Sequence, residues 1–261
     1  MDPKQTPFFK AMQLCEGVLV ILDKEATPFQ RIWCCFEQAT VAQGKKLLLD
    51  IATVQDGEPE LLTDGVAYDI HRCPEPNEGP LHPSYAEYIK GMREKHFPLE
   101  LATRSFGTEL QKAEASMPAD RTRILNTIAG RTGAELQLPA EAAHPSYDRL
   151  NAVLRGRFAA SALAQLIEEG EPLGPCVAAL KLSEMPKLPL TLKFPEETAE
   201  ALGRQVFGSL PAELEELDLR SSTLRRGGLM ALAAALPTTN IRVLRCARPI
   251  HTHLSAPHEH F

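Results

Sequence analysis

Near its start the chain alternates continuous apolar runs with an amphipathic stretch. The run Gly17-Val-Leu-Val-Ile-Leu-Asp23 is apolar up to its last position, as expected of a parallel strand covered on both faces. Residues 29–43 carry apolar side chains at the i, i+3, i+4, i+7 spacing of a helix, and Thr27-Pro28 marks its start. A second apolar run covers residues 46–54. Strand, helix and strand in this order predict a βαβ unit with a parallel sheet.

The pattern is less regular in the middle of the chain. Prolines and acidic residues over 55–83 predict a long irregular loop. Residues 147–169 predict a long helix that closes at Gly170-Glu-Pro. The remaining expectations, in chain order, are the end of a helix over 7–16, a helix over 84–95, a strand within 99–110, a helix over 118–129 and a connector over 131–145.

The last part of the chain contains a repeat. Leu190-Thr-Leu192, Leu217-Asp-Leu219 and Leu244-Arg-Cys246 are short apolar motifs, and 27 residues separate Leu190 from Leu217 and Leu217 from Leu244. Helical segments over 197–210 and 228–236 lie between them, and each ends in Leu-Pro. This period is typical of leucine-rich repeats, and LEELDLRSSTLRRGGLMALAAALP resembles the ribonuclease-inhibitor type.

A leucine-rich repeat array predicts a protein-docking face along its strands. The candidate residues of this face are Leu217, Asp218, Leu219 and Arg220. For the arginines of this segment, a solvated surface that binds no partner remains the simpler alternative. Because three strands and two helices make a short solenoid, the array is expected to pack against the helix at 147–169.

Composition narrows the range of partners and compartments. Hydrophobic residues make up 44% and charged residues 24% of the 261 residues, which is typical of a globular protein. The net charge of −6 gives no basic surplus, so neither nucleic acid nor an anionic membrane is expected as a partner. The N-terminus has no apolar signal region, no apolar run has the length of a membrane helix, and the six cysteines lack CxxC spacing. We therefore expect a cytoplasmic protein with reduced thiols and no metal site; the His-rich end is expected to be disordered.

One helical segment carries candidate chemistry. Trp33 and Glu37 are i, i+4 neighbours and share a face, with Cys34 next to them. The helix follows the strand that ends at Asp23, and ligands of open α/β sheets bind beyond the carboxyl ends of the strands. A carboxylate there could hold a ribose hydroxyl or stabilise positive charge as a glycosidic bond breaks. From spacing alone, Trp33 as a core residue and Glu37 as a solvated carboxylate remain the simpler alternatives.

The segment from residue 7 to residue 54 resembles the second half of a Toll/interleukin-1 receptor (TIR) domain, with closest similarity to TIR-like proteins of unicellular algae and protists. The resemblance rests on an apolar strand, a short turn, Trp33-Cys34-x-x-Glu37 opening a helix, and a further buried strand. It implies a partial flavodoxin-like parallel sheet, NAD as a substrate and no resident cofactor. It also implies Glu37 as the catalytic carboxylate, Trp33 and Cys34 as motif companions, and self-association of the domain.

The chain also departs from the TIR pattern. It begins at what would be the end of the second helix, so a preceding strand, helix and strand are expected to be missing. Asp23 stands where serine is usual. NAD cleavage is therefore expected to be weak or lost.

The expected domains are a TIR-like α/β domain over 1–130, a helical linker over 131–180, leucine-rich repeats over 181–250 and a tail over 251–261. Two hypotheses follow for the function. The first is a signalling or protein-interaction protein that docks a partner on its repeats. The second is an NAD nucleosidase that uses Glu37 and is regulated by the repeats. A fragment of a longer repeat receptor is a third, purely structural hypothesis.

Overall fold

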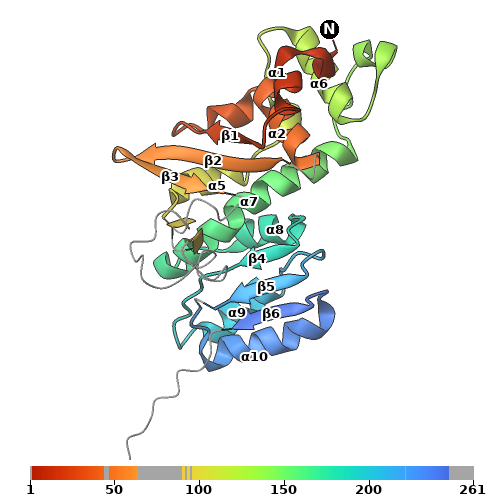
Figure 1. Cartoon of the computed structure of the whole chain (residues 1–261). Helices are drawn as coiled ribbons and strands as arrows, with labels where there is room; N and C mark the ends of the chain where they lie inside the picture. The colour runs from red at the N-terminus through yellow and green to blue at the C-terminus, as the bar shows by residue number, and fades with distance from the viewer. Residues whose placement is uncertain are drawn as a thin grey trace, which may run out of the picture.

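A computed structural model describes residues 2–43, 47–63, 90–91, 93–94, 96–220 and 222–246. In this part of the chain the fold is mixed α/β, with two three-stranded sheets and a long helix between them (Figure 1). None of the helices in these ranges has the length and apolar character needed to cross a membrane. The expectations for most of the 55–83 loop, for the first part of the 84–95 helix and for the 251–261 tail lie outside the described residues.

The first sheet confirms the predicted βαβ unit. Strand β1 (Gly17–Ile21) pairs in parallel with β2 (Leu48–Gln55), and helix α2 (Ile32–Gln43) connects them. The helix begins later than expected because Thr27–Gln30 forms a separate 3-10 turn. Arg31 is then extended and bridges to Glu114, so the regular helix cannot start before Ile32.

The expectation that both faces of the β1 strand are covered is wrong. Val20 is buried, whereas Leu19 and Ile21 are 56% and 66% exposed. Successive side chains of a strand point to opposite faces. The helices therefore cover only the face that carries Val20, and an apolar face of the first sheet is open.

Two expectations for the next segment are also wrong. Residues 58–62 form strand β3 (Glu58–Leu62), which pairs antiparallel with β2, instead of a loop. The connection is Asp56-Gly57, and both residues have positive φ, as tight hairpin turns require.

The strand expected within 99–110 is instead helix α5 (Leu99–Ser105) followed by a 3-10 turn at Leu110–Lys112. Helix α1 (Pro7–Met12) and helix α6 (Pro118–Ile128) agree with the sequence expectations, and a 3-10 turn at Gly133–Gln137 lies in the expected connector.

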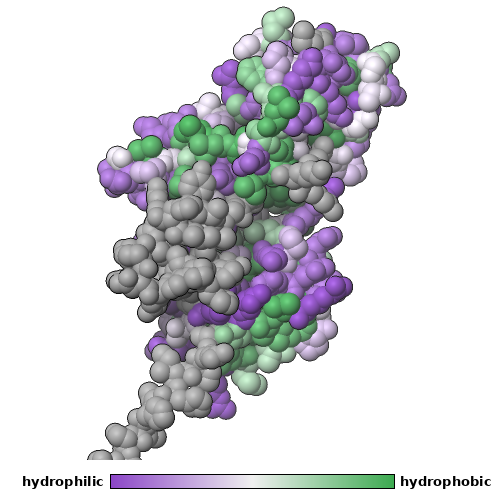
Figure 2. Space-filling view, in the orientation of Figure 1, coloured by the Kyte–Doolittle hydropathy of each residue, from purple (hydrophilic) through white to green (hydrophobic). Residues whose placement is uncertain are grey.

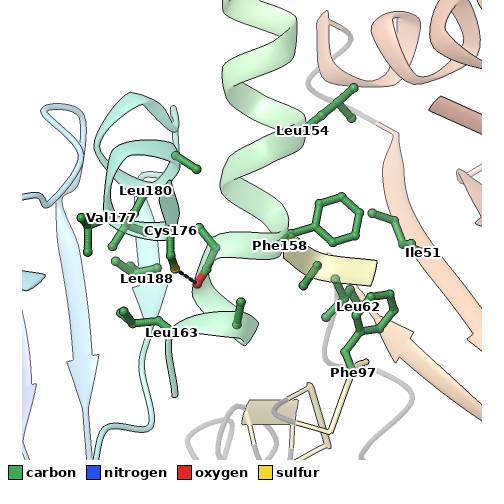
Figure 3. Packing of buried hydrophobic residues seen from close by; sticks show 14 of the residues in the cluster. Ile51, Leu62, Phe97, Leu154, Phe158, Leu163, Cys176, Val177, Leu180 and Leu188 are labelled. Atoms are coloured by element: carbon green, nitrogen blue, oxygen red, sulfur yellow. Dashed lines mark hydrogen bonds between the residues drawn. The ribbon is translucent and has the colours of Figure 1, made fainter. Parts of the chain in front are cut away.

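The long helix α7 (Pro145–Glu169) lies at the centre of the molecule. Proline occupies its first position, the Nδ1 atom of His144 accepts a hydrogen bond from the backbone N–H of Ser146 (3.2 Å), and left-handed Gly170 ends it. Figure 3 shows Phe158 of α7 pointing toward Ile51, Leu62 and Phe97 on one side. On the other side helix α8 (Gly174–Leu182) packs against α7, and the thiol of Cys176 donates to the carbonyl of Ala159 (3.3 Å). Helices α7 and α8, which belong to the segment expected to be a helical linker, therefore contribute to a hydrophobic core that includes residues of both sheets.

The second sheet is parallel and consists of β4 (Lys187–Pro189), β5 (Glu216–Leu219) and β6 (Val243–Cys246). Helix α9 (Ala199–Phe207) connects β4 to β5, and α10 (Arg225–Ala235) connects β5 to β6. The two helices approach closely because small residues face one another. A Cβ on Gly203 would lie 2.8 Å from the Cβ of Ala231 and 3.0 Å from the Cα of Gly228.

The pairing of the first repeat strand differs from the expectation. Leu188, and not Leu190, is the partner of Leu217, while Leu217 pairs with Leu244 as expected. A shift of two residues keeps each side chain on the same face of a strand. Leu188, Leu190 and Leu192 are accordingly all buried, so the apolar pattern alone could not distinguish the two pairings.

Candidate functional site

A large cleft lies between the two sheets in the described part of the chain, and we call it the inter-sheet cleft. Its volume is about 730 Å³. Helix α7 contributes one wall and the second sheet another. Strands β2 and β3 form a third together with Lys90, Gly91 and Glu94. The charged residues that line it are Lys90, Glu94, Arg149, Arg157, Glu184, Lys187, Glu213, Glu216 and Asp218.

A ladder of alternating charge crosses the second sheet, and two of its members, Lys187 and Glu216, line the cleft. Glu216 pairs in register with Lys187 on β4, and their Oε2 and Nζ atoms are 3.3 Å apart. Its Oε1 atom accepts from Nε of Arg245 on β6 at 2.7 Å. The hydrogen bond from Arg245 is the main reason why the pKa of Glu216 lies below its ordinary value. The outer face of this sheet therefore carries a +, −, + sequence across three strands, and Figure 2 shows hydrophilic side chains gathered over β4 and β5.

A second ion pair lies one pleat further along β5. The Nε atom of Arg220 donates to both carboxylate oxygens of Asp218, at 3.0 and 3.1 Å. Burial alone would raise the pKa of Asp218, but the hydrogen bonds from Arg220 lower it below its ordinary value. Asp218 therefore stays ionised at neutral pH, and its carboxylate lines the cleft.

The other two walls of the cleft also carry charges. Arg157 of α7 donates to the backbone carbonyl of Leu49, and burial lowers its pKa to about 10 although nearby Asp50 opposes the shift. Glu94 accepts from the backbone N–H of Thr63 at 2.7 Å and lies 3.4 Å from Nζ of Lys90. Burial raises the pKa of Glu94, and Lys90 opposes this effect. These pairs fix charged groups of both signs on the first-sheet side.

The base of the cleft is apolar. Val153, Ala160 and Ala164 of α7 line it together with Met185 and Leu188. Small side chains on the helix leave room, since larger ones would fill the space between the sheets. An apolar base with fixed charges on its walls is the arrangement that a protein segment with an apolar anchor and charged flanks would fit.

Only part of the expected docking face lies on the surface. Asp218 and Arg220 are half-buried and belong to the outer side of the sheet. Leu217 and Leu219 are 0% and 2% exposed, so their inclusion in the face is wrong. Their side chains point toward α9 and α10 because alternate residues of β5 face opposite sides.

Sequence reasoning missed the residues that flank Glu216 on this sheet. Lys187 and Arg245 stand on the neighbouring strands, and their charges are opposite to that of Glu216. The repeat spacing could not have found them, because a period of 27 residues aligns Glu216 with Pro189 and Val243, whereas Lys187 and Arg245 are each 29 residues from Glu216. No spacing along the chain indicates that Arg157 and Lys90 face the same cleft, since they belong to other elements.

The Trp33-Cys34-x-x-Glu37 segment lies in the first two turns of α2, away from the inter-sheet cleft. All three side chains are half-buried, and the Trp33 ring meets Phe36 edge-on at 6.2 Å between ring centres. Burial raises the pKa of Glu37. Burial, followed by the charge of Glu37, raises the pKa of the Cys34 thiol. The three residues are thus brought together on one helix end, as expected from their spacing.

A second cleft, of about 540 Å³, lies at the carboxyl end of β1, where ligands of α/β sheets commonly bind. We call it the β1-end cleft. Its lining includes Ala26, Arg31, Arg104 and Lys112, but none of Trp33, Cys34 and Glu37. Asp23 serves the turn beside it: its Oδ1 atom accepts from the backbone N–H of Thr27 at 2.8 Å, and hydrogen bonds from Thr27 lower its pKa. The geometry therefore does not connect Glu37 with this cleft.

Among the described residues, His, Cys, Asp and Glu side chains form no group of three that could hold a metal ion. Comparison of the chain with protein-family models, with curated proteins and with solved structures found no match.

Proposed function

We propose that this chain is a protein-interaction module of a signalling protein, in which a TIR-like α/β domain is joined to a short leucine-rich repeat array. In this proposal a segment of a partner protein binds in the inter-sheet cleft. The charged ladder Lys187–Glu216–Arg245 on the outer face of the second sheet is the observation that carries the proposal. Leucine-rich repeat arrays bind proteins with this face of their strands.

Two features of the cleft support a protein segment as the ligand. Its volume, about 730 Å³, is that of a site which encloses several side chains. Its apolar base can take an apolar anchor, while the fixed charges on both walls select flanking residues of opposite sign.

A peptide-display selection tests this proposal. Peptides are selected on the full chain and then tested against Lys187→Glu, which reverses one end of the ladder on a side chain that is 69% exposed. Peptides that bind in the cleft are expected to lose about tenfold in affinity, because a nearby attraction becomes a repulsion. The matched control is Lys181→Glu, the same charge change on the exposed surface of α8, which should leave binding unchanged.

A selection that yields no common peptide sequence contradicts the proposal. So does a set of peptides that binds the wild type and Lys187→Glu equally well. Thermal unfolding of both variants shows whether a loss of binding comes from loss of the fold.

The alternative function is NAD nucleosidase activity with Glu37 as the catalytic carboxylate. It is supported by the resemblance around Trp33 and by the raised pKa of a half-buried Glu37. The position of Glu37 outside both clefts favours the docking function instead. Release of nicotinamide from NAD by the wild type and by Glu37→Ala distinguishes the two functions.

A further inference from the structure

Strand β1 forms one edge of the first sheet in the described part of the chain (Figure 1). The backbone N–H of Leu48 donates to the carbonyl of Glu16 (3.0 Å), and that of Leu22 donates to the carbonyl of Ala52 (2.7 Å). Alternate residues of a strand direct their backbone groups to the same neighbour, so the even-numbered residues face β2. The N–H and C=O groups of Gly17, Leu19 and Ile21 therefore point away from the sheet.

This edge lacks the usual protection against pairing with another strand. Natural edge strands are commonly protected by charged side chains, proline or a bulge. Gly17-Val-Leu-Val-Ile21 has none of these, and its pairing with β2 is regular along its whole length. Charges occur only beyond its two ends, at Glu16 and at Asp23-Lys24.

The open face of the first sheet adds apolar surface beside this edge. Leu19 and Ile21 are joined on β2 by Leu48 and Val54, which are 46% and 67% exposed. Figure 2 shows hydrophobic side chains over part of the first sheet. Apolar patches of this kind on a protein surface commonly mark an interaction site.

We propose that a second copy of this chain pairs with β1, antiparallel, about a twofold axis at Val20. Leu19 then lies opposite Ile21 of the other copy, and their outward backbone groups form the hydrogen-bonded pairs of the new ladder. The two sheets become one six-stranded sheet, and the apolar side chains of Leu19 and Ile21 from both copies meet on its open face, with Asp50 of each β2 beside Leu19. This inference concerns a surface separate from the inter-sheet cleft and does not depend on the docking function.

Charge selects this register among those that the backbone allows. Glu16 lies just before β1 and Lys24 lies in the turn that follows it, and both side chains are exposed. Centring the pairing on Val20 brings the Glu16 end of each copy next to the Lys24 end of the other. Among the described residues, the ion pair of Lys24 is a 3.7 Å contact with its neighbour Glu25. Centring on Leu19 would place Lys24 opposite Leu14, and centring on Ile21 would place it opposite Val18. A twofold axis doubles each contact, so the favoured register contains two ion pairs.

The experiment uses two variants that each repel themselves but attract one another. In Glu16→Lys both positions are basic, and in Lys24→Glu both are acidic. Each variant alone should self-associate roughly tenfold more weakly than the wild type, since two attractions become two repulsions. An equimolar mixture should recover the dimer, because every contact between the two variants is again between opposite charges. Sedimentation velocity measures all four samples at low ionic strength.

Ile21→Lys places a charge in the middle of the edge and should yield a monomer. Its matched control is Leu138→Lys, where the same kind of change affects an apolar side chain that is 51% exposed elsewhere. Thermal unfolding verifies the fold of each variant. The proposal is overturned if the wild type is monomeric at about 100 µM, or if the dimer survives Ile21→Lys. It is also overturned if the mixture of charge variants associates no better than each variant alone.

Discussion

Gly156 of α7 and Ser183, at the end of α8, are in such close contact that a Cβ on Gly156 would lie 2.2 Å from the Cβ of Ser183. The atoms that it would meet are the Cα, Cβ and Oγ of Ser183, so no flexible side chain can move aside. The absence of a side chain at position 156 is thus what lets α8, and with it the second sheet, pack against α7.

Gly156→Ala is expected to destabilise the protein by about 1–3 kcal/mol. Alanine favours a helix over glycine by up to about 1 kcal/mol, which offsets only part of the overlap with Ser183. Urea unfolding measures the change. Gly174→Ala is the control, because a Cβ at that position meets no atom within 4 Å. Equal stability of the two variants would contradict the close packing of α7 and α8.

Gln38 of α2 is a buried amide whose Nε2 and Oε1 atoms have no hydrogen-bond partner in the described part of the structure. Burying an unpaired amide costs about 1–3 kcal/mol. Gln38→Met keeps the length of the side chain and removes both polar atoms, so we expect the free energy of unfolding to rise by about 1 kcal/mol. A lower unfolding midpoint for this variant would show that the amide does have a partner.

Asn126 of α6 is the opposite case. Its Nδ2 atom donates to the carbonyls of Glu135 (3.3 Å), Leu136 (3.2 Å) and Leu138 (2.7 Å), and its Oδ1 atom accepts from Arg131 (2.8 Å). Asn126→Leu leaves these groups without the amide and is expected to cost about 2–4 kcal/mol. The two amide replacements should therefore shift the urea midpoint in opposite directions.

The parts of the fold that the sequence predicted correctly are those with strong local patterns. Apolar runs on either side of a helical stripe defined β1, α2 and β2, and the long stripe of α7 was equally clear. Strand β3 was missed because Glu58, Pro59 and Glu60 are atypical of a strand, although Asp56-Gly57 is a hairpin signal. The local composition thus argued against a strand, although the hairpin turn and the pairing with β2 do form one.

The sequence could not predict which faces of the sheets are covered or where clefts form, for another reason. The apolar run of β1 predicts burial on both faces, but whether an element covers the face of Leu19 depends on the path of the whole chain. The inter-sheet cleft likewise combines Arg157 of α7 with Lys187 of β4, which no local pattern relates. The charged ladder was not predictable from the repeat, since the 27-residue period aligns Glu216 with Pro189, whereas the strands pair it with Lys187.

Glu37→Gln is expected to stabilise the protein at neutral pH. Burial raises the pKa of Glu37 in the folded state above its value in the unfolded chain, so the folded state favours the protonated form. The wild type therefore gains stability as the pH falls through the folded pKa toward about 4.3, and the neutral variant does not. Because the side chain is half-exposed, the gain at pH 7 should be below about 1 kcal/mol. Melting temperatures between pH 4 and 7.5 measure the difference, which should disappear at the acidic end.

Nicotinamide release from NAD is expected to remain at the protein-free background for both the wild type and Glu37→Ala. A glycosidic cleavage needs the carboxylate beside the ribose, but Glu37 lines neither the inter-sheet cleft nor the β1-end cleft. The Trp33 ring is already engaged edge-on with Phe36, and Asp23 caps the turn at Thr27. Chromatography of the reaction over several hours measures the product. Release by the wild type that Glu37→Ala abolishes would instead establish the nucleosidase alternative, and it would require the end of α2 to open toward the β1-end cleft.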